Sequence, residues 1–454
     1  MRRFALALAV LSSLLIAAQC LGATRPRYGG TLRVNTRAAL ISLDPGDPNP
    51  ADVLMLNNVS RLLFDTLVTL DDKGKPRPSL ATSWQAEQGG QRWIFTLRSG
   101  VRLQDGSPVM PDIVAAALRS TNPTWKVLAS DNAVVIESDS PASDLPGQMA
   151  LARNSIVKRN GDKLMGTGPF VLASWQPGKK LTLTARDDYW NGRPFLDTIE
   201  IDLGRNLREQ MIALDLGKVD LIDVDLEQAH RAATDGRRVI SSAPIELLAL
   251  VFQRDRQSDD EGELRRALAL IVDRSSLKNV ILQGSGEVGG SILPNWLSGY
   301  AFLFPAGVEL RAARELRDQV GHVPTWTLGY DTGDPVGRLL AERIALNARD
   351  AGLVLQPTMS SNTDVRLMRI PISSLDAGIA LSNVAARVGT NVPKPGGNSV
   401  DDLYQTEKTL LASQRVIPLL HLRVSYALAP AVRWDQPPDG SWRLADVWLG
   451  TAKP

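Results

Sequence analysis

Short runs of alternating apolar and polar residues recur along the chain, and most are bounded by glycine, proline or aspartate. This alternation predicts β-strands at residues 31–35, 67–74, 93–97, 171–175, 181–185, 198–203, 219–223, 325–331 and 353–357. Apolar residues spaced three or four apart predict helices over residues 51–64, 111–119, 205–216, 263–272, 274–283 and 336–351. Strands and helices alternate, so the sequence predicts an α/β protein with more than one sheet.

The first residues have the form of a secretory signal peptide, predicted over residues 1–23. Two arginines precede an apolar run over residues 4–18, which is short for a bilayer-spanning helix, and small residues follow. A retained membrane anchor would need a longer run. Cys20 offers a lipid-anchored alternative, but Gln19 fits poorly where a lipoprotein has a small residue. We therefore expect a soluble exported protein, cleaved after Ala23.

Charge is balanced once that segment is removed. The whole chain carries 51 basic and 49 acidic residues, and the two arginines of the signal segment account for the difference. A neutral mature chain argues against nucleic acid or an anionic membrane surface as the main partner. About 430 residues predict two or three domains. Without Cys20 the mature chain has no thiol, so it forms no disulfide.

Motifs for catalysis or metal binding lack the context that they need. Residues 284–290, GSGEVGG, match a dinucleotide-binding pattern, but a helix is predicted before them where a strand is required. The three histidines are widely spaced, and the acidic run 220–228 lacks the glycine of a calcium loop. No nucleophile, base and orienting group come together. We expect no catalytic residue, no metal site and no cofactor.

Several sequence blocks occur in the order and spacing of one known family. They are YGGTLRV with SLDP, LFDTLVTLDDKGKPRPSLATSWQ, WIFTLRSGVRLQDGSPV with PDIVAAALR, GTGPFVLASWQPGKKLTLTARDDYWNGRPFLDTIEI, ELRRALALIVDRSSLKNVILQG and VIPLLHLRVSYAL. The chain thereby resembles the family 5 extracellular solute-binding proteins of ABC importers, which include oligopeptide-, dipeptide- and nickel-binding proteins. The resemblance spans most of the mature chain.

The resemblance implies a two-lobed periplasmic-binding-protein fold (type II, large peptide-binding-protein-like) with a hinge and an extra small domain. Lobe I would combine residues 24–45, 165–255 and 420–454. The small domain would be 46–164, shortened between Arg119 and Gly166, and lobe II would be 256–419. A solute that contacts both lobes would shift the open–closed equilibrium, and the closed form would be recognised by the permease.

Within this resemblance, the stretch DDYWNGRP at residues 187–194 is interpreted as a turn. Two adjacent acids beside two aromatic residues are also a pattern of sugar-cleaving or metal sites. A catalytic acid pair, however, needs a cleft and a second partner group. Asn191-Gly192 would form the turn, with Tyr189 and Trp190 packed against the lobe and the two aspartates solvated or capping backbone amides.

The chain departs from the family pattern where peptide binders hold the ligand's ammonium group. The matching segment is LDAGIALSN at residues 375–383, interpreted as a strand, after which the acidic position falls near Ala385 with Arg387 close by. An unpaired buried ammonium is costly. We therefore expect a preference for ligands with a carboxylate, phosphate or neutral polar groups over free-amine peptides, with Asp376 as the next acid to consider.

The expected ligand-binding residues come from four segments, and their aromatic members supply contact area while polar groups fix orientation. They are Asn35, Arg37, Phe252, Gln253, Asn295, Trp296, Tyr300, Asn383 and Arg387. For Phe252 and Trp296 a position in the hydrophobic core is an equal alternative.

The sequence thus predicts a non-enzymatic, periplasmic substrate-binding component of an ABC importer. Its partners would be a peptide or other small polar solute, and the permease and ATPase of the inner membrane. A monomer is expected. The alternatives are a secreted hydrolase whose catalytic acids are among the predicted turns, and a divergent member that acts as a sensor or chaperone component.

Overall fold

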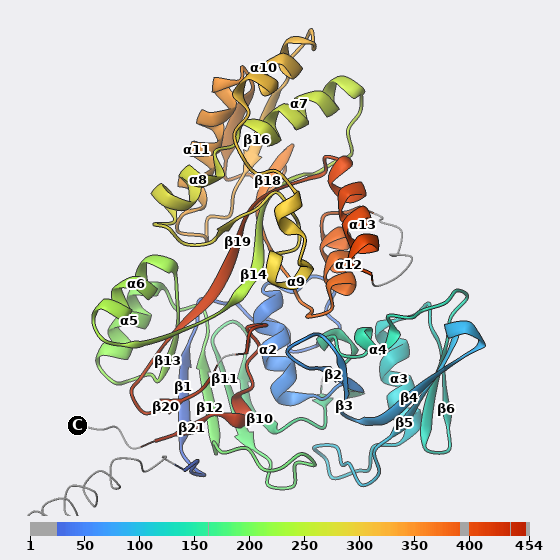
Figure 1. Cartoon of the computed structure of the whole chain (residues 1–454). Helices are drawn as coiled ribbons and strands as arrows, with labels where there is room; N and C mark the ends of the chain where they lie inside the picture. The colour runs from blue at the N-terminus through green and yellow to red at the C-terminus, as the bar shows by residue number, and fades with distance from the viewer. Residues whose placement is uncertain (1–24, 162, 391–398, 436, 451–454) are drawn as a thin grey trace, which may run out of the picture.

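A computed structural model describes residues 25–161, 163–390, 399–435 and 437–450 of the chain. The predicted signal peptide and Cys20 lie outside these residues. Figure 1 shows an upper lobe, a lower lobe and a smaller region beside the lower lobe. Two long strands run from the lower lobe into the upper one.

One mixed sheet extends through both lobes. Its strands, in spatial order, are β10 (Phe170–Gln176), β11 (Lys180–Ala185), β12 (Thr198–Asp202), β1 (Thr31–Asn35), β13 (Leu221–Val224), β19 (Val416–Leu428), β14 (Arg238–Phe252), β18 (Val365–Pro371), β16 (Thr325–Gly329) and β17 (Val354–Thr358), while β15 (Glu287–Val288) pairs with β19.

The long strands β14 and β19 pair antiparallel with one another and connect the lobes. Residues 247–252 of β14 are buried without alternation, as expected for a strand covered on both faces. The register of the pair shifts between Ser241 and Glu246. Such irregularities bend a strand, and this one lies where β14 passes from one lobe to the other.

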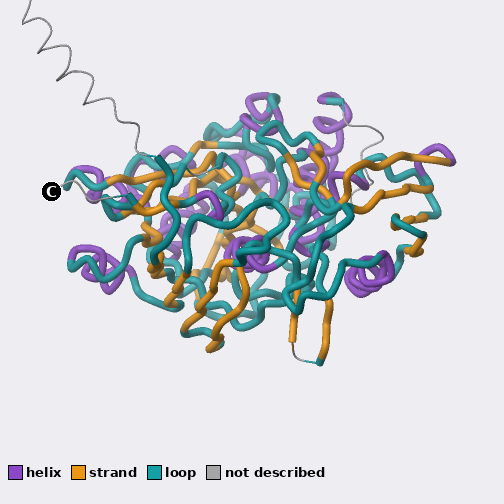
Figure 2. Tube along the Cα trace, turned by 90° about the horizontal axis from the view of Figure 1, so that it is seen from below, coloured by secondary structure: helices purple, strands orange, loops and turns teal. Residues whose placement is uncertain are grey.

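Helices lie mostly around the outside of the strands (Figure 2). The lower lobe carries α2 (Val53–Leu63), α5 (Leu207–Asp215) and α6 (Leu226–Thr234). The upper lobe carries α7 (Asp259–Ile271), α8 (Arg274–Ser276), α9 (Asn295–Ser298), α10 (Leu310–Asp318), α11 (Gly337–Asp350), α12 (Ala377–Arg387) and α13 (Val400–Ala412). Aspartate side chains begin several of them: Asp52 accepts from the Met55 amide and Asp225 from the Gln228 amide, both at 2.8 Å.

The smaller region has its own sheet and core. Its strands, in spatial order, are β4 (Ala81–Glu87), β5 (Arg92–Leu97), β7 (Ala133–Glu137) and β6 (Lys126–Ser130). Helices α3 (Pro111–Thr121) and α4 (Leu145–Gln148) accompany it, and Phe95, Leu118 and Val134 are buried in its core. Three two-stranded ladders complete the strands: β2 (Val68–Leu70) with β3 (Pro76–Pro78), β8 (Lys158–Asn160) with β9 (Lys163–Met165), and β20 (Val432–Arg433) with β21 (Trp448–Leu449).

The predicted strands and helices are confirmed with shifts of a few residues, except for the segment 375–383. We predicted a strand there, and this was wrong: the segment opens helix α12, and Asp376 caps it by accepting from the Ile379 amide at 3.0 Å. Ile379, Ala380, Val384 and Val388 are buried at helical spacing. The alignment that placed an acidic position near Ala385 therefore loses its basis.

The stretch DDYWNGRP is a turn, as predicted. The Gly192 amide donates to the Tyr189 carbonyl at 3.0 Å, and Gly192 has a φ of 98°, which suits glycine. Both aspartate carboxylates are exposed and each pairs with an arginine: Asp187 with Arg193 at 2.6 Å and Asp188 with Arg186 at 3.1 Å.

The glycine-rich segment 284–290 follows a helical turn and contains β15, so the strand–glycine–helix context of a dinucleotide site is absent there. In the described parts of the chain, no helix is long and apolar enough to cross a membrane. The same residues contain no group of three or more His, Cys, Asp or Glu side chains placed to hold a metal ion.

Candidate functional site

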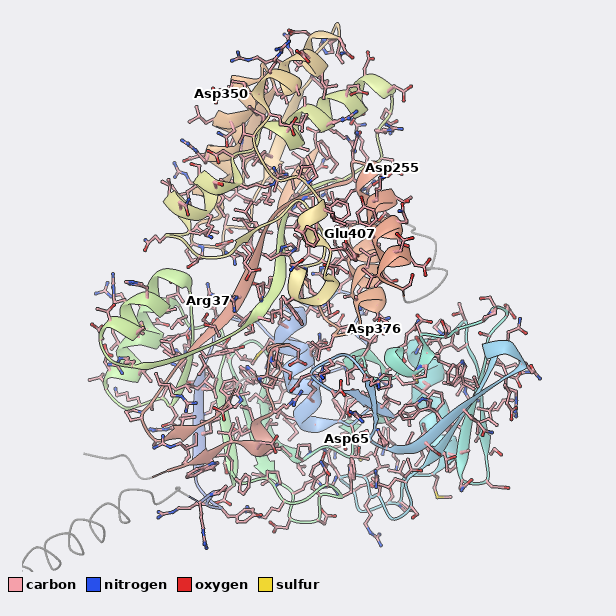
Figure 3. All side chains as sticks on the ribbon, in the orientation of Figure 1. Arg37, Asp65, Asp255, Asp350, Asp376 and Glu407 are labelled. Atoms are coloured by element: carbon pink, nitrogen blue, oxygen red, sulfur yellow. The ribbon has the colours of Figure 1, made fainter. Side chains whose placement is uncertain are left out.

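A cavity of about 490 Å³ lies where the two lobes meet. Lower-lobe residues reach it from the end of β1, the start of α2 and the end of β13. Upper-lobe residues reach it from β18 and from the loop between β16 and α11, and the crossing strands β14 and β19 also contribute to the lining. Figure 3 shows Arg37, one of its lining residues, at the level where the upper and lower parts meet.

Charged side chains dominate the cavity lining. Acids outnumber bases by six to three: Asp52, Asp223, Asp225, Glu246, Asp331 and Asp334 against Arg37, Arg369 and Arg423. The Arg423 guanidinium is itself engaged at 2.9 Å by Glu287, which lies outside the lining. The cavity therefore carries a surplus of negative charge, and such a cleft attracts cations.

Two of the arginines are paired within the cavity, one on each lobe. Arg37 contacts Asp223 at 3.0 Å, and Asp223 also accepts from the Arg37 amide at 3.1 Å. Arg369 contacts Asp334 at 2.8 Å and Glu246 at 3.8 Å. These pairs neutralise part of the lining and leave Asp52 and Glu246 incompletely compensated.

Glu246 stands on β14, where the strand crosses between the lobes. Its carboxylate makes no hydrogen bond to the described residues, and its contact with Arg369 is longer than a hydrogen bond. Burial raises the pKa of Glu246, the Arg369 charge lowers it, and the negative charge of Asp52 adds to the rise. Loss of solvation also raises the pKa of Asp52, despite the amide of Met55.

Two aromatic residues also line the cavity. Tyr426 on β19 and Trp442 both line it, with ring centroids 6.0 Å apart and the planes inclined at 67°. The Trp442 indole donates to the Tyr426 hydroxyl at 2.9 Å, which leaves the phenolic hydrogen free of any described acceptor. Aromatic side chains together with acidic ones in one lining suit a ligand with a cationic end and an apolar or amphipathic body.

A narrower groove of about 50 Å³ adjoins the cavity, since Leu54, Asn58, Val424 and Tyr426 line both. It continues along α2 toward the small region and passes between Ala150-Leu151 and residues 372–375 of the upper lobe. In the view of Figure 3, Arg37 and Asp376, which follows those upper-lobe residues, lie on opposite sides of α2.

Among the predicted site residues, Arg37 lines the cavity. Asn35 is buried at the end of β1, next to the lining residue Thr36. Phe252 is 1% exposed and packs edge-on against Trp326 in the upper core, so it takes the alternative position that we considered. Gln253 follows it, and its side chain donates to the Val251 carbonyl at 3.0 Å.

The loop after β15 also lies apart from the cavity lining. The indole of Trp296 donates to the Pro244 carbonyl at 2.8 Å, beside the register shift of β14, while Asn295 is exposed. The Tyr300 hydroxyl donates at 2.8 Å to Glu407, which is fully buried on α13. Loss of solvation raises the pKa of Glu407 to about 7.

The last two predicted residues lie on α12. Arg387 is exposed in its final turn and lines neither the cavity nor the groove. Asn383 accepts from Arg153 and donates to Ser373, each at 3.2 Å, and Ser373 lines the groove. Asn383 is therefore connected to the groove lining through its hydrogen bond to the Ser373 hydroxyl.

Sequence reasoning missed most of the acidic lining. Asp52 and Asp225 were visible as helix caps, and Asp331 and Asp334 follow a predicted strand at its carboxyl end, where ligands of α/β sheets commonly lie. Glu246 gave a stronger signal, because it is an acid inside an otherwise apolar run over residues 243–252.

Two lobes joined by crossing strands, with a polar cavity between them, define the class of two-lobed binding proteins. Residues 75–390 match the family model of bacterial extracellular solute-binding proteins, family 5 (Middle). The match covers more than half of the chain, so the chain belongs to this family. It is accordingly a solute-binding protein and not an enzyme.

Individual relatives agree with this assignment. The chain is 26% identical to Protein XP55 of Streptomyces lividans over 82% of this chain and 81% of that protein. It is 23% identical to the probable D,D-dipeptide-binding periplasmic protein DdpA of Escherichia coli, over 75% of this chain and 72% of that protein. The solved structure of DppA from Helicobacter pylori with the peptide STSA shares the fold at a TM-score of 0.80 and 17% identity, covering 94% of this chain and 99% of that one.

Proposed function

We propose that this chain is the exported substrate-binding component of an ABC importer, and that its cavity captures a peptide-like solute by a positively charged amino group. Relatives of the chain are named for oligopeptide, dipeptide and nickel binding. Among ligands of these kinds, the negative charge of the cavity favours those that carry an amino group. It argues against the preference for anionic ligands expected from Arg387.

The observation that carries this proposal is the pair Asp52 and Glu246. They belong to different elements, line one cavity, and each keeps a raised pKa that loss of solvation produces. Two incompletely paired acids in one cavity are costly in the empty protein. An ammonium group placed beside them would compensate both charges at once, and this converts the cost into ligand affinity.

Closure of the two lobes on the solute would present the loaded form to the permease, and a partner ATPase would drive transport. The proposal includes a monomer in the periplasm, released by cleavage after Ala23. It also includes the division into lobe I (24–45, 165–255 and 420–454), a small domain (46–164) and lobe II (256–419), except that α2 packs in the core of the lower lobe and is assigned to lobe I. N-terminal sequencing of exported protein tests the cleavage, because a chain that begins at lipid-modified Cys20 would contradict it.

A thermal-shift panel tests the ligand class. Trialanine and cadaverine represent amines, N-acetyl-trialanine the blocked amine, and succinate and phosphate the anions. A ligand at about a hundred times its dissociation constant stabilises the folded state by about 2.7 kcal/mol, which gives a clear shift of the melting temperature. We expect shifts with the amines alone.

The same panel on the double variant Asp52→Asn/Glu246→Gln distinguishes binding in the cavity from binding to acidic residues elsewhere on the surface. The matched control is Glu315→Gln, which removes an exposed acid of α10 that pairs with Arg311. Shifts should disappear in the double variant and persist in the control. Shifts produced by succinate or phosphate, or amine shifts that survive the double variant, would contradict the proposal.

A further inference from the structure

The crossing strand β14 is irregular where it passes between the lobes. Its pairing with β19 shifts register on both sides of Pro244, and Pro244 has no backbone N–H to donate to a neighbouring strand. A regular ladder therefore does not fix this point of the strand. Because β14 connects the lobes, the backbone angles at this bend affect how the lobes are oriented.

Backbone hydrogen bonds hold the residues on either side of Pro244, one from each lobe. The Ala243 amide donates at 3.0 Å to the carbonyl of Pro438, which belongs to a C-terminal segment that packs in the lower lobe. The Ile245 carbonyl accepts at 2.7 Å from the amide of Ile372, which packs in the upper lobe. The bend thus lies between two anchor points that belong to different lobes.

Trp296 contacts the bend from outside the sheet. It lies on α9 of the upper lobe, and its indole N–H donates to the Pro244 carbonyl at 2.8 Å. Figure 1 shows α9 beside β14, near the level at which the lobes meet. Trp296 is 37% exposed, so filling the hydrophobic core does not explain this side chain. Its directional contact is the hydrogen bond to the bend.

The loop that carries Trp296 is fastened to the upper lobe at both of its ends. At its start, the Glu407 carboxylate accepts from the Ile292 amide, and His421 donates to the Ile292 carbonyl at 3.0 Å. At its end, the Tyr300 hydroxyl donates to the same carboxylate at 2.8 Å. Glu407 on α13 and His421 on β19 are both buried, so the loop is a firm support for the indole.

A firm support on one lobe and a bend in the connecting strand restrict each other. While the indole bond is in place, the backbone at Pro244 changes its angles only if α9 moves with it. Without the bond, the bend would be held by backbone contacts alone. The lobes of the empty protein would then sample a wider range of orientations.

We propose that Trp296 is a positioning residue for solute binding. Its indole braces the bend of β14 from the upper lobe and restricts the orientation of the lobes in the empty protein. It thereby also keeps Glu246, two residues after Pro244, at its place in the cavity lining. The consequence for affinity rests on the proposed function, whereas the consequence for the lobes does not.

Distances between spin labels on the two lobes test the brace in the empty protein. Residues 24–454 contain no cysteine, so Ser174→Cys on the lower lobe and Ser361→Cys on the upper lobe can be labelled selectively. Both serines are exposed. Trp296→Phe keeps an aromatic ring and removes the N–H donor. We expect a broader distribution of distances in this variant than in the unaltered protein.

Trp93→Phe is the matched control. The Trp93 indole also donates to a backbone carbonyl, that of Gly90 at 3.1 Å, but it lies on β5 in the smaller region. The substitution removes the same kind of hydrogen bond away from the crossing strands. Its distance distribution should equal that of the unaltered protein.

Titration calorimetry with trialanine measures the consequence for binding. Fewer molecules of Trp296→Phe would have the orientation that binds, so this variant should bind trialanine about fivefold more weakly than the unaltered protein. Trp93→Phe should bind trialanine as the unaltered protein does.

An unchanged distance distribution in Trp296→Phe, or an equal broadening in Trp93→Phe, would overturn the brace. Equal affinity of Trp296→Phe and the unaltered protein for trialanine would overturn the positioning role. If trialanine binds to none of these proteins, the proposed function fails instead, and the distances in the empty protein decide whether Trp296 is a brace.

Discussion

Two partly buried acids, Asp65 and Glu246, show how the same side-chain chemistry can have a structural or a ligand-binding role. Asp65 follows α2 and accepts three hydrogen bonds: from Thr167 at 2.8 Å, from Tyr189 at 3.0 Å and from Trp190 at 2.8 Å. Glu246 faces the interlobe cavity and accepts none from the described residues. Figure 3 places Asp65 within the lower part of the molecule, well below the level of Arg37.

The two acids differ in how many hydrogen bonds their carboxylates accept from the protein. Loss of solvation raises the pKa of both acids. At Asp65 the three donors oppose that rise and also fix the turn 189–192 against the end of α2, so the acid is part of the structure. At Glu246 the protein supplies few opposing groups, so the missing partner has to come from a ligand.

The largest effect on stability is expected at Asp65, whose carboxylate already accepts three hydrogen bonds from the protein. Asp65→Ala removes the acceptor of three donors, and we expect it to lower the free energy of unfolding by about 3 kcal/mol, since unsatisfied donors cost about 1–3 kcal/mol each. Denaturant unfolding measures this. Asp65→Asn keeps one acceptor oxygen and should lose less; a loss below about 0.5 kcal/mol in Asp65→Ala would show that the network is dispensable.

Glu407 on α13 is another buried acid whose carboxylate accepts hydrogen bonds from the protein itself, and it should affect stability rather than ligand binding. It accepts from Tyr300 and from the amide of Leu293, and its pKa is raised from 4.5 to about 7. A raised folded-state pKa means that the folded protein binds more protons than the unfolded chain between pH 4.5 and 7. The contribution of Glu407 to stability is therefore greatest below pH 4.5 and is lost as the pH rises to about 7.

We expect Glu407→Gln to remove this dependence and to gain about 2 kcal/mol relative to the unaltered protein between pH 5 and pH 8. Unfolding by denaturant at the two pH values provides the comparison. A variant whose stability changes with pH as the unaltered protein does would mean that Glu407 stays protonated throughout this range or titrates with an ordinary pKa.

Asp52 and Glu246 should make ligand affinity increase with pH, whereas the contribution of Glu407 to stability decreases with pH. An ammonium ligand needs Asp52 and Glu246 ionised, and the pKa of each is raised in the empty cavity. Affinity for trialanine should therefore be highest at neutral pH and fall about tenfold or more as the pH is lowered toward those pKa values. Calorimetry between pH 5 and 8 measures it, and affinity that increases on acidification would contradict the acidic anchor.

The smallest effect is expected at the acids of the turn itself. Asp187 is 87% exposed on its side chain and pairs with Arg193 at the surface. Exposed pairs contribute about 0–1 kcal/mol, so Asp187→Asn should change the free energy of unfolding by less than about 0.5 kcal/mol and leave binding unaltered. Loss of binding in this variant would show that the turn belongs to the functional site.

The sequence predicted the parts of this comparison that local patterns determine. The turn in residues 187–194, the strands on either side of it and the two-lobed fold follow from alternation, turn residues and family blocks, although the turn centres on Trp190-Asn191, one residue before the predicted pair. The partner of Tyr189 and Trp190 did not follow, because Asp65 lies more than a hundred residues earlier in the chain. Long-range pairing of this kind leaves no periodic signal.

The candidate site was harder to predict for the same reason. Its acids come from four separate segments, and those outside β14 have a local explanation as a cap or as a residue at or after a strand end. The helix over 377–387 was mistaken for a strand because its buried residues include a short run that reads as a strand when taken alone. Only the fold shows that Glu246 and Asp52 share one cavity.

The most direct test of this account is a pair of measurements on Glu246→Gln. The substitution keeps the shape of the side chain and removes a poorly compensated charge. We predict that the empty protein becomes more stable by about 1 kcal/mol at pH 8, while its affinity for trialanine falls about tenfold or more. A variant that is less stable when empty, or that binds trialanine as tightly as the unaltered protein, would show that Glu246 is a structural acid like Asp65.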